Sequence, residues 1–114
     1  MNVQTKPLRV GIIGLGVGQA HAEAFAKHPG CAVVALCDFA AKKQDWAREH
    51  YPQVKVTAKA EEILTAPAID VVSICSYDDM HYEQIMLAIK HDKHIFVEKP
   101  LCLKPRMPGP YGTP

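Results

Sequence analysis

The sequence has no excess of charge of either sign and no long apolar segment. Thirteen basic residues are balanced by twelve acidic ones, for a formal net charge of +1. No basic stripe or acidic tail is present, which argues against a nucleic-acid partner. The longest apolar runs, such as VVSIC and GIIGLGVG, are too short to span a bilayer, and MNVQTKP at the start lacks the apolar part of a signal peptide. We therefore expect no nucleic-acid or membrane partner and a cytoplasmic location.

Cysteine is scarce and shows no metal-binding pattern. The four cysteines stand at positions 31, 37, 75 and 102. None forms a CxxC pair, and no histidine lies at zinc-ligand spacing from them. Cys37 and Cys75 fall within apolar runs, where a free cysteine behaves as a small hydrophobic residue. We predict reduced thiols and no metal site.

The chain of 114 residues has the length of one domain with a single core. Short apolar runs alternate along it with helical patterns. The runs are apolar throughout, as in strands that helices cover on both faces. This predicts an α/β fold, a doubly wound parallel sheet of the Rossmann type in the order 3-2-1-4-5. The predicted strands are 8–14, 31–38, 54–57, 69–76 and 94–98, and the predicted helices are 18–28, 40–51, 59–65 and 81–92.

A glycine-rich stretch, GIIGLGVGQAHAEAF, follows the first strand and opens the first helix. Gly14 permits a tight turn, and Gly16, without a Cβ, lets a pyrophosphate approach the backbone around Val17. The helix then points its N-terminal amides at the phosphates. Gly18 comes one residue early, giving GxGxG in place of GxGxxG, so the close packing of helix on strand relies on Gly18 or Ala20. A glycine turn without a ligand is the alternative interpretation.

An acidic residue ends the second strand. Asp38 stands twenty-four residues after Gly14, where a carboxylate can accept hydrogen bonds from both hydroxyls of an adenosine ribose. It would repel a 2′-phosphate, and no arginine follows closely, so the pattern favours NAD over NADP. Asp38 also suits the N-cap of the helix predicted at 40–51, which is the structural alternative.

Methyltransferases that use S-adenosylmethionine share these features. They too carry GxGxG after the first strand and an acid at the end of the second, as this chain does. The glycine loop and Asp38 therefore leave two cofactor classes open, and residues further along the chain must distinguish them.

The segment VVSICSYDDMHYEQIMLAIKHDKHIFVEKPL makes that distinction. It resembles the nucleotide-binding half of the glucose-fructose oxidoreductase/inositol dehydrogenase family of NAD(P)-dependent sugar oxidoreductases. Members of that family show Ser/Thr-Pro-Asn-x-x-His after the fourth strand and GKHVxxEKP after the next helix. Tyr77 and Asp78 stand where proline and asparagine are usual, and the resemblance covers about residues 8–104. The matching residues are Ser76, His81, His94, Glu98, Lys99 and Pro100.

The resemblance implies roles for individual residues. Lys99 would lie near the nicotinamide and the substrate hydroxyl, which it positions or deprotonates as hydride leaves the carbon; a surface lysine is the alternative. Ser76, Tyr77, His81 and Glu98 would lie at the cofactor, although His81 also suits a helix cap and Glu98 a structural partner. The implied cofactor is NAD, with NADP less favoured, and the implied substrate is a sugar or polyol.

The resemblance also divides the chain. Residues 1–104 form the dinucleotide-binding domain, and residues 105–114 depart from the family; five of the nine prolines lie from Pro100 onward, which predicts a disordered tail. Family members continue into a second domain that supplies the substrate pocket. We therefore expect this chain alone to be an inactive cofactor half that self-associates through the edge of its fifth strand. The alternative is a stand-alone NAD(H)-binding module without turnover.

Overall fold

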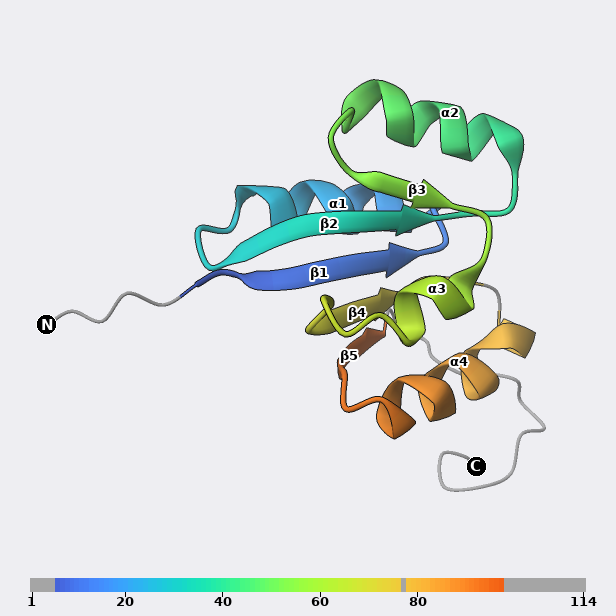
Figure 1. The fold of residues 1–114 in the computed structure, drawn as a ribbon. Helices are drawn as coiled ribbons and strands as arrows, with labels where there is room; N and C mark the ends of the chain where they lie inside the picture. The colour runs from blue at the N-terminus through green and yellow to red at the C-terminus, as the bar shows by residue number, and fades with distance from the viewer. Residues whose placement is uncertain (1–5, 77, 98–114) are drawn as a thin grey trace, which may run out of the picture.

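The computed structural model describes residues 6–76 and 78–97, apart from the side chains of residues 78–81. Five parallel strands form one sheet in the order β3-β2-β1-β4-β5, with helices on both sides (Figure 1), which confirms the predicted fold and strand order. The elements are β1 (Leu8–Ile13), α1 (Gly18–Lys27), β2 (Cys31–Cys37), α2 (Ala41–His50), β3 (Lys55–Thr57), α3 (Ala60–Leu64), β4 (Val71–Ile74), α4 (Asp78–Lys90) and β5 (His94–Val97). The boundary predicted at residue 104 lies outside the described residues.

Side chains alternate along the strands between two helical layers. On β1, Val10 packs in a core cluster that includes Ala22 of α1 and Ala47 of α2. Ile13 belongs to the other cluster, which includes Ala88 of α4. Helices α1 and α2 accordingly cover one face of the sheet, and α3 and α4 cover the other (Figure 1). Burial on both faces is the physical reason that the strands read as continuous apolar runs.

Helix α4 differs from its prediction in its start and in the face it buries. It begins at Asp78, three residues before the predicted start, where negative charge favours a helix N-terminus. The sequence pattern places Tyr82, Ile85, Ala88 and Ile89 on one apolar face. The structure buries Ala88, but Tyr82 is 71% exposed and Ile89 is exposed, whereas Gln84 is only 7% exposed. The apolar spacing predicted the helix correctly, but of that face only Ala88 and the partly buried Ile85 pack into the core.

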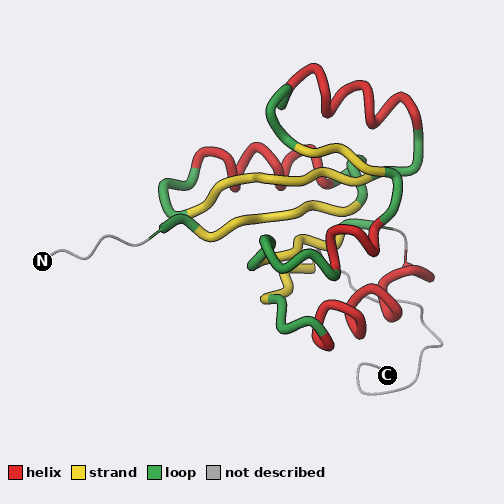
Figure 2. Tube along the Cα trace, in the orientation of Figure 1, coloured by secondary structure: helices red, strands yellow, loops and turns green. Residues whose placement is uncertain are grey.

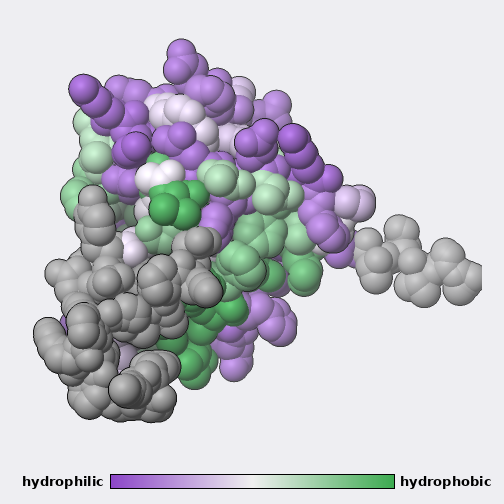
Figure 3. All heavy atoms as spheres, turned by 180° about the vertical axis from the view of Figure 1, so that it is seen from behind, coloured by the Kyte–Doolittle hydropathy of each residue, from purple (hydrophilic) through white to green (hydrophobic). Residues whose placement is uncertain are grey.

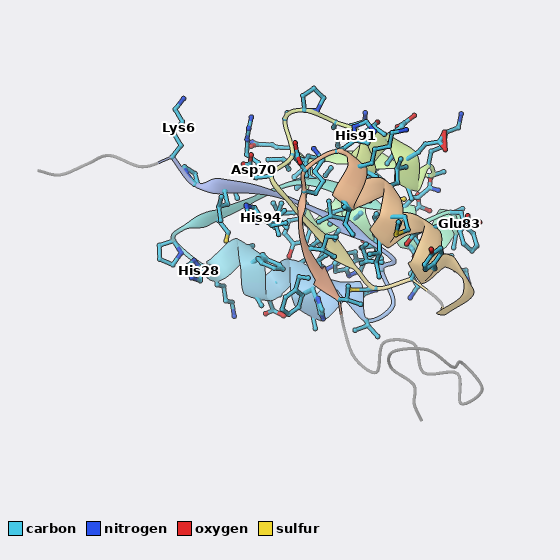
Figure 4. The ribbon with its side chains drawn as sticks, turned by 90° about the horizontal axis from the view of Figure 1, so that it is seen from below. Lys6, His28, Asp70, Glu83, His91 and His94 are labelled. Carbon is cyan, nitrogen blue, oxygen red and sulfur yellow. The ribbon has the colours of Figure 1, made fainter. Side chains whose placement is uncertain are left out.

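Charged side chains secure the amino-terminal ends of the central strands. Asp70, just before β4, accepts hydrogen bonds from the Arg9 backbone amide at 2.8 Å and from the Arg9 guanidinium at 3.1 Å. These bonds lower the pKa of the Asp70 carboxyl. Lys93 donates to the carbonyl oxygens of Ala66 and, at 2.7 Å, Ile69. Figure 4 shows Asp70 well apart from Glu83 on α4. Arg9 lies near the start of β1 and Asp70 just before β4, so these bonds are structural and lie away from the carboxyl ends of the strands.

Three cysteines in the described part of the chain, Cys31, Cys37 and Cys75, are free thiols, as the sequence predicts. Within residues 6–76 and 78–97, no group of three or more His, Cys, Asp or Glu side chains is placed to hold a metal ion. Over the same residues, none of the helices combines the length and hydropathy needed to cross a membrane.

Strand β5 lies at one edge of the sheet and pairs with β4 through four residue pairs. On it, Phe96 is 49% exposed and touches His21 and Phe25 of α1 edge-on, with ring centroids 5.3 and 5.9 Å away. Seen from behind, hydrophobic side chains gather in a band across the molecule (Figure 3). A strand edge next to apolar surface is a template for pairing with another chain.

We therefore predict concentration-dependent self-association of the 114-residue chain. Light scattering over a hundredfold concentration range should show an apparent mass that rises, and Phe96→Lys should reduce that rise because a charge on an edge strand opposes pairing. Glu83→Lys, a charge reversal at an exposed position on α4, is the matched control and should not. A monomeric mass at every concentration contradicts the prediction.

The turn after β1 depends on Gly14, whose φ is +92°. A Cβ at Gly14 would lie 2.7 Å from the backbone of Cys75 and 2.8 Å from that of Ser76. Both contacts are with backbone atoms, which cannot rotate away. A Cβ at Gly16, two residues on, would meet nothing within 4 Å.

These two glycines make a matched pair of variants. Gly14→Ala should lower the free energy of unfolding by about 2–4 kcal/mol, because it combines a left-handed backbone with overlap against the backbone that follows β4. Gly16→Ala should change it by about 0.5 kcal/mol or less. Urea denaturation followed by circular dichroism measures both. Equal stability of the two variants would contradict this prediction, because it would mean that the backbone of Cys75 and Ser76 can move away from residue 14 at no cost in free energy.

Candidate functional site

A cleft opens at the carboxyl ends of β1, β2 and β4. The strand order runs outward from β1 through β2 on one side and through β4 on the other, and ligands of doubly wound sheets bind at such a reversal. Figure 2 shows that the connections that follow β1, β2 and β3 all leave the sheet at the same end of the strands. The cleft has a volume of about 620 Å³, within the usual range for small-molecule sites. It is lined by Ile13, Gly14, Gly16, Val17, Cys37, Asp38, Phe39, Ala40, Lys43, Ala58, Ala60, Cys75, Ser76 and Gln84.

The glycine loop forms the floor of the cleft. The Gly14 amide donates to the Cys37 carbonyl at 2.8 Å, which ties the end of β1 to the end of β2. Gly16 is exposed and faces open space. Gly18 is buried, and a Cβ there would lie 3.0 Å from the side chain of Ile12. Gly18 is thus the residue that lets α1 pack closely on β1, whereas Ala20, the other candidate, is exposed.

Helix α1 presents an uncapped end to this cleft. Its N-cap residue is Val17, which lines the cleft and makes no side-chain capping bond, and its first turn contains no acidic residue. The Gln19 and Ala20 amides donate to the carbonyls of Gly16 and Val17, but the first turn of a helix still carries partial positive charge. This arrangement suits an anionic group such as a phosphate.

The Asp38 carboxylate joins two loops of the cleft. Its Oδ2 accepts from the Leu15 amide and its Oδ1 from the Ala40 amide, both at 2.8 Å. The helix N-cap alternative for Asp38 is wrong, because the N-cap residue of α2 is Ala40 and no side-chain bond caps that helix. A carboxylate has about four lone-pair sites, so Asp38 retains acceptor capacity for ligand hydroxyls.

The two thiols of the cleft lie in different surroundings. Burial, together with the negative charges of Asp38 and Glu62, raises the pKa of Cys37 to about 12, so that this thiol stays protonated and unreactive near neutral pH. The Cys75 Sγ lies 3.4 Å from Nδ1 of His21, and that nitrogen also lies 2.8 Å from the hydroxyl of the buried Ser73. His21 therefore joins α1 to β4, which agrees with a packing role for it.

The structure adds lining residues that sequence reasoning missed. Gln84 of α4 accepts a hydrogen bond from Ser76 Oγ at 2.6 Å, which explains why a polar residue is buried on that helix. Phe39 and Lys43 lie beyond Asp38, on the loop and first turn that lead into α2. For Phe39, its place directly after the strand-ending acid was the one available signal.

Five of the predicted site residues line one cleft, and a sixth, Gly18, packs beneath it. His81 belongs to α4, but its side chain is not among those described. Tyr77, Glu98 and Lys99 lie outside the described residues. The five lining residues are Gly14, Gly16, Val17, Asp38 and Ser76.

Comparison with known proteins identifies the family. Residues 8–108 match the model of GFO_IDH_MocA, described as an oxidoreductase family with an NAD-binding Rossmann fold. The chain is 33% identical over 103 residues to the D-glucoside 3-dehydrogenase of Escherichia coli K12, covering 89% of this chain and 29% of that protein. It is 32% identical over 97 residues to the myo-inositol 2-dehydrogenase of Thermotoga maritima, covering 84% of this chain and 29% of that one. The chain thus spans less than a third of the length of these relatives.

Solved structures agree in fold. The scyllo-inositol dehydrogenase of Lactobacillus casei with bound NAD(H) and scyllo-inositol superposes with a TM-score of 0.79 at 32% identity, covering 87% of this chain and 30% of that one. The biliverdin reductase of Synechocystis with biliverdin and NADP+ gives a TM-score of 0.80 at 26% identity, covering 86% and 31%.

These matches decide the cofactor class that the glycine loop and Asp38 had left open. The matching family is described as an oxidoreductase family with an NAD-binding Rossmann fold, and the S-adenosylmethionine alternative is therefore wrong. The chain belongs to the GFO_IDH_MocA oxidoreductase family and carries its NAD-binding Rossmann fold.

Proposed function

We propose that this chain binds NAD(H) in the cleft at the carboxyl ends of β1, β2 and β4. It is then the cofactor half of an oxidoreductase that acts on a hydroxyl of a sugar, a sugar derivative or a cyclitol. The observation that carries the proposal is the pairing, in one cleft, of the open backbone at Gly16 with the Asp38 carboxylate. Relatives named as glucoside and inositol dehydrogenases support the substrate class.

The residues present fit a dinucleotide. The backbone at Gly16, Val17 and Gly18 would face the pyrophosphate, because Gly16 leaves the approach open and the N-terminus of α1 carries no cap. Asp38 would accept from the hydroxyls of the adenosine ribose. Ser76 of the cleft lining would face the nicotinamide side, at the end of β4.

The NAD preference is proposed from the charge of Asp38, which would oppose a 2′-phosphate. Lys43 lines the same cleft and would act in the opposite direction, because a lysine attracts phosphate. Asp38 is the closer of the two to the glycine loop, since it accepts the Leu15 amide directly. We therefore expect NADH to bind more tightly than NADPH, with Lys43 reducing the difference.

Lys99 is proposed as the catalytic residue. Bound NAD supplies the acceptor for the hydride that leaves the substrate carbon. Lys99 would hold the substrate hydroxyl and accept its proton; a lysine beside a cationic ring and partly removed from water has a lowered pKa, which suits it to this task. His81, Tyr77 and Glu98 are proposed to lie at the same end of the cofactor.

A stand-alone NAD(H)-binding module is the second candidate. The glycine loop and Asp38, which line the cleft, would serve such a module equally well. Such a module would bind the cofactor in the same cleft without turning over a substrate.

Titration with NADH tests cofactor binding. The nicotinamide fluorescence should rise to saturation with the wild-type chain, and S-adenosylmethionine should not displace the NADH. Gly16→Val should weaken NADH binding about tenfold or more, because its side chain would occupy the approach of the pyrophosphate, while the urea midpoint changes little. Absence of binding by a folded wild-type chain would overturn the proposed function.

Asp38 is tested by Asp38→Asn, which keeps one acceptor oxygen for an amide and removes the charge. NADH affinity should fall about tenfold or more, since a hydrogen bond to a charged group contributes roughly 1.5–3 kcal/mol. NADPH affinity should fall less. Lys43→Met should have the opposite selectivity, weakening NADPH more than NADH. Asp45→Asn, on the exposed side of α2, is the control and should leave both affinities unchanged. Equal losses of NADH and NADPH affinity in Asp38→Asn would mean that Asp38 only holds its loops in place.

Turnover separates the two candidate functions. We predict no measurable oxidation of polyols by the 114-residue chain, because substrate orientation, which contributes roughly 7–11 kcal/mol to lowering a barrier, needs a substrate pocket. The chain extended with the second domain of a relative should oxidise a cyclitol or glucoside, and Lys99→Ala should abolish this. Oxidation of a polyol by the 114-residue chain would show that the predicted inactivity is wrong. Activity of the extended Lys99→Ala variant would show that the catalytic role proposed for Lys99 is wrong.

A further inference from the structure

Phe39 is the most exposed large hydrophobic side chain of the described residues, at 74%. It is also part of the cleft lining. Isolated hydrophobic residues on a surface are ordinary. An exposed aromatic ring that lines a cleft, however, is available for contact with a bound ligand.

The backbone on both sides of Phe39 is fixed. The Asp38 amide donates to the Thr57 carbonyl at 3.2 Å, and the Asp38 carbonyl accepts from the Gln44 side chain at 2.8 Å. On the other side, the Ala40 amide donates to the Asp38 carboxylate. Phe39 is thus the middle residue of a turn that hydrogen bonds close from both ends, and its ring is presented without a large cost in backbone entropy on binding.

The surroundings select a flat ligand group. The wall contributed by the segment after β3 consists of Ala58 and Ala60, which lie in the same lining. The bond between Asp38 and Thr57 brings this segment beside Phe39. Small side chains next to an exposed ring leave room for a planar group to cover the ring face, and aromatic groups prefer offset stacking at such sites.

We propose that Phe39 is the stacking platform for the adenine base of the bound dinucleotide. The inference rests on the proposed function, because the base is attached to the ribose that Asp38 would hold, and Phe39 is the next residue in the chain. Stacking does not read the hydrogen-bonding edge of the base. Stacking alone would accept any planar base, so specificity for adenine would need other contacts.

Binding of NADH and of ADP-ribose to the wild-type chain and to Phe39→Ala, Phe39→Leu and Phe39→Trp tests this, by calorimetry. Phe39→Ala should weaken both ligands about tenfold or more, the size expected for the loss of one base–aromatic stack. Phe39→Trp should restore affinity, and Phe39→Leu should not. Tyr82→Ala, which removes another exposed ring, at 71% exposure and outside the cleft lining, should leave both affinities unchanged.

The outcomes distinguish a failure of the stacking role of Phe39 from a failure of the proposed NAD(H) binding. If the wild-type chain binds neither ligand, the proposed function fails. If it binds both and Phe39→Ala binds them equally well, the function stands and the stacking role is wrong. Restoration of affinity by Phe39→Leu would mean that Phe39 provides apolar bulk only, and this result overturns the platform.

Discussion

The structure depends on how closely the end of β1 approaches the end of β4. At Gly14 the chain adopts a left-handed conformation against the backbone of Cys75 and Ser76, and its amide bonds to the end of β2 at Cys37. Three strand ends therefore meet at one residue that lacks a side chain. The cleft exists because the chain can leave the sheet at this point and return as α1, with the helix N-terminus directed at the opening.

Asp38 connects the strand ends that meet at Gly14 with the proposed cofactor binding. Its carboxylate holds the glycine loop through Leu15 and the start of α2 through Ala40, so the group assigned to the ribose is also a structural connection between both walls of the cleft. Such a group is preorganised, because its position is set before the ligand arrives. Preorganisation extends to Phe39, which follows it in the same closed turn.

Much of the fold could be predicted because strand order follows from simple constraints. Runs such as 31–37 and 71–74 are apolar on both faces, which requires helices on both sides and hence parallel strands with crossovers. The glycine loop and Asp38 could be predicted because each directly follows an apolar run that is recognisable as a strand. The burial of Gln84 and the exposure of Tyr82 on α4 could not be predicted from helical spacing, because Gln84 is buried with a hydrogen-bond partner, Ser76, that lies outside the helix.

The family, the strand order and the core of the candidate site could be predicted from the sequence alone, since periodicity and local motifs are properties of neighbouring residues. Three features became known from the fold: Gly18, and not Ala20, packs α1 on the sheet, Asp38 bonds to Leu15 and does not cap α2, and Phe39 and Lys43 belong to the cleft. The physical reason is that these are contacts between segments distant along the chain. Their geometry is set by strand pairing and helix packing, which no local pattern of residues records.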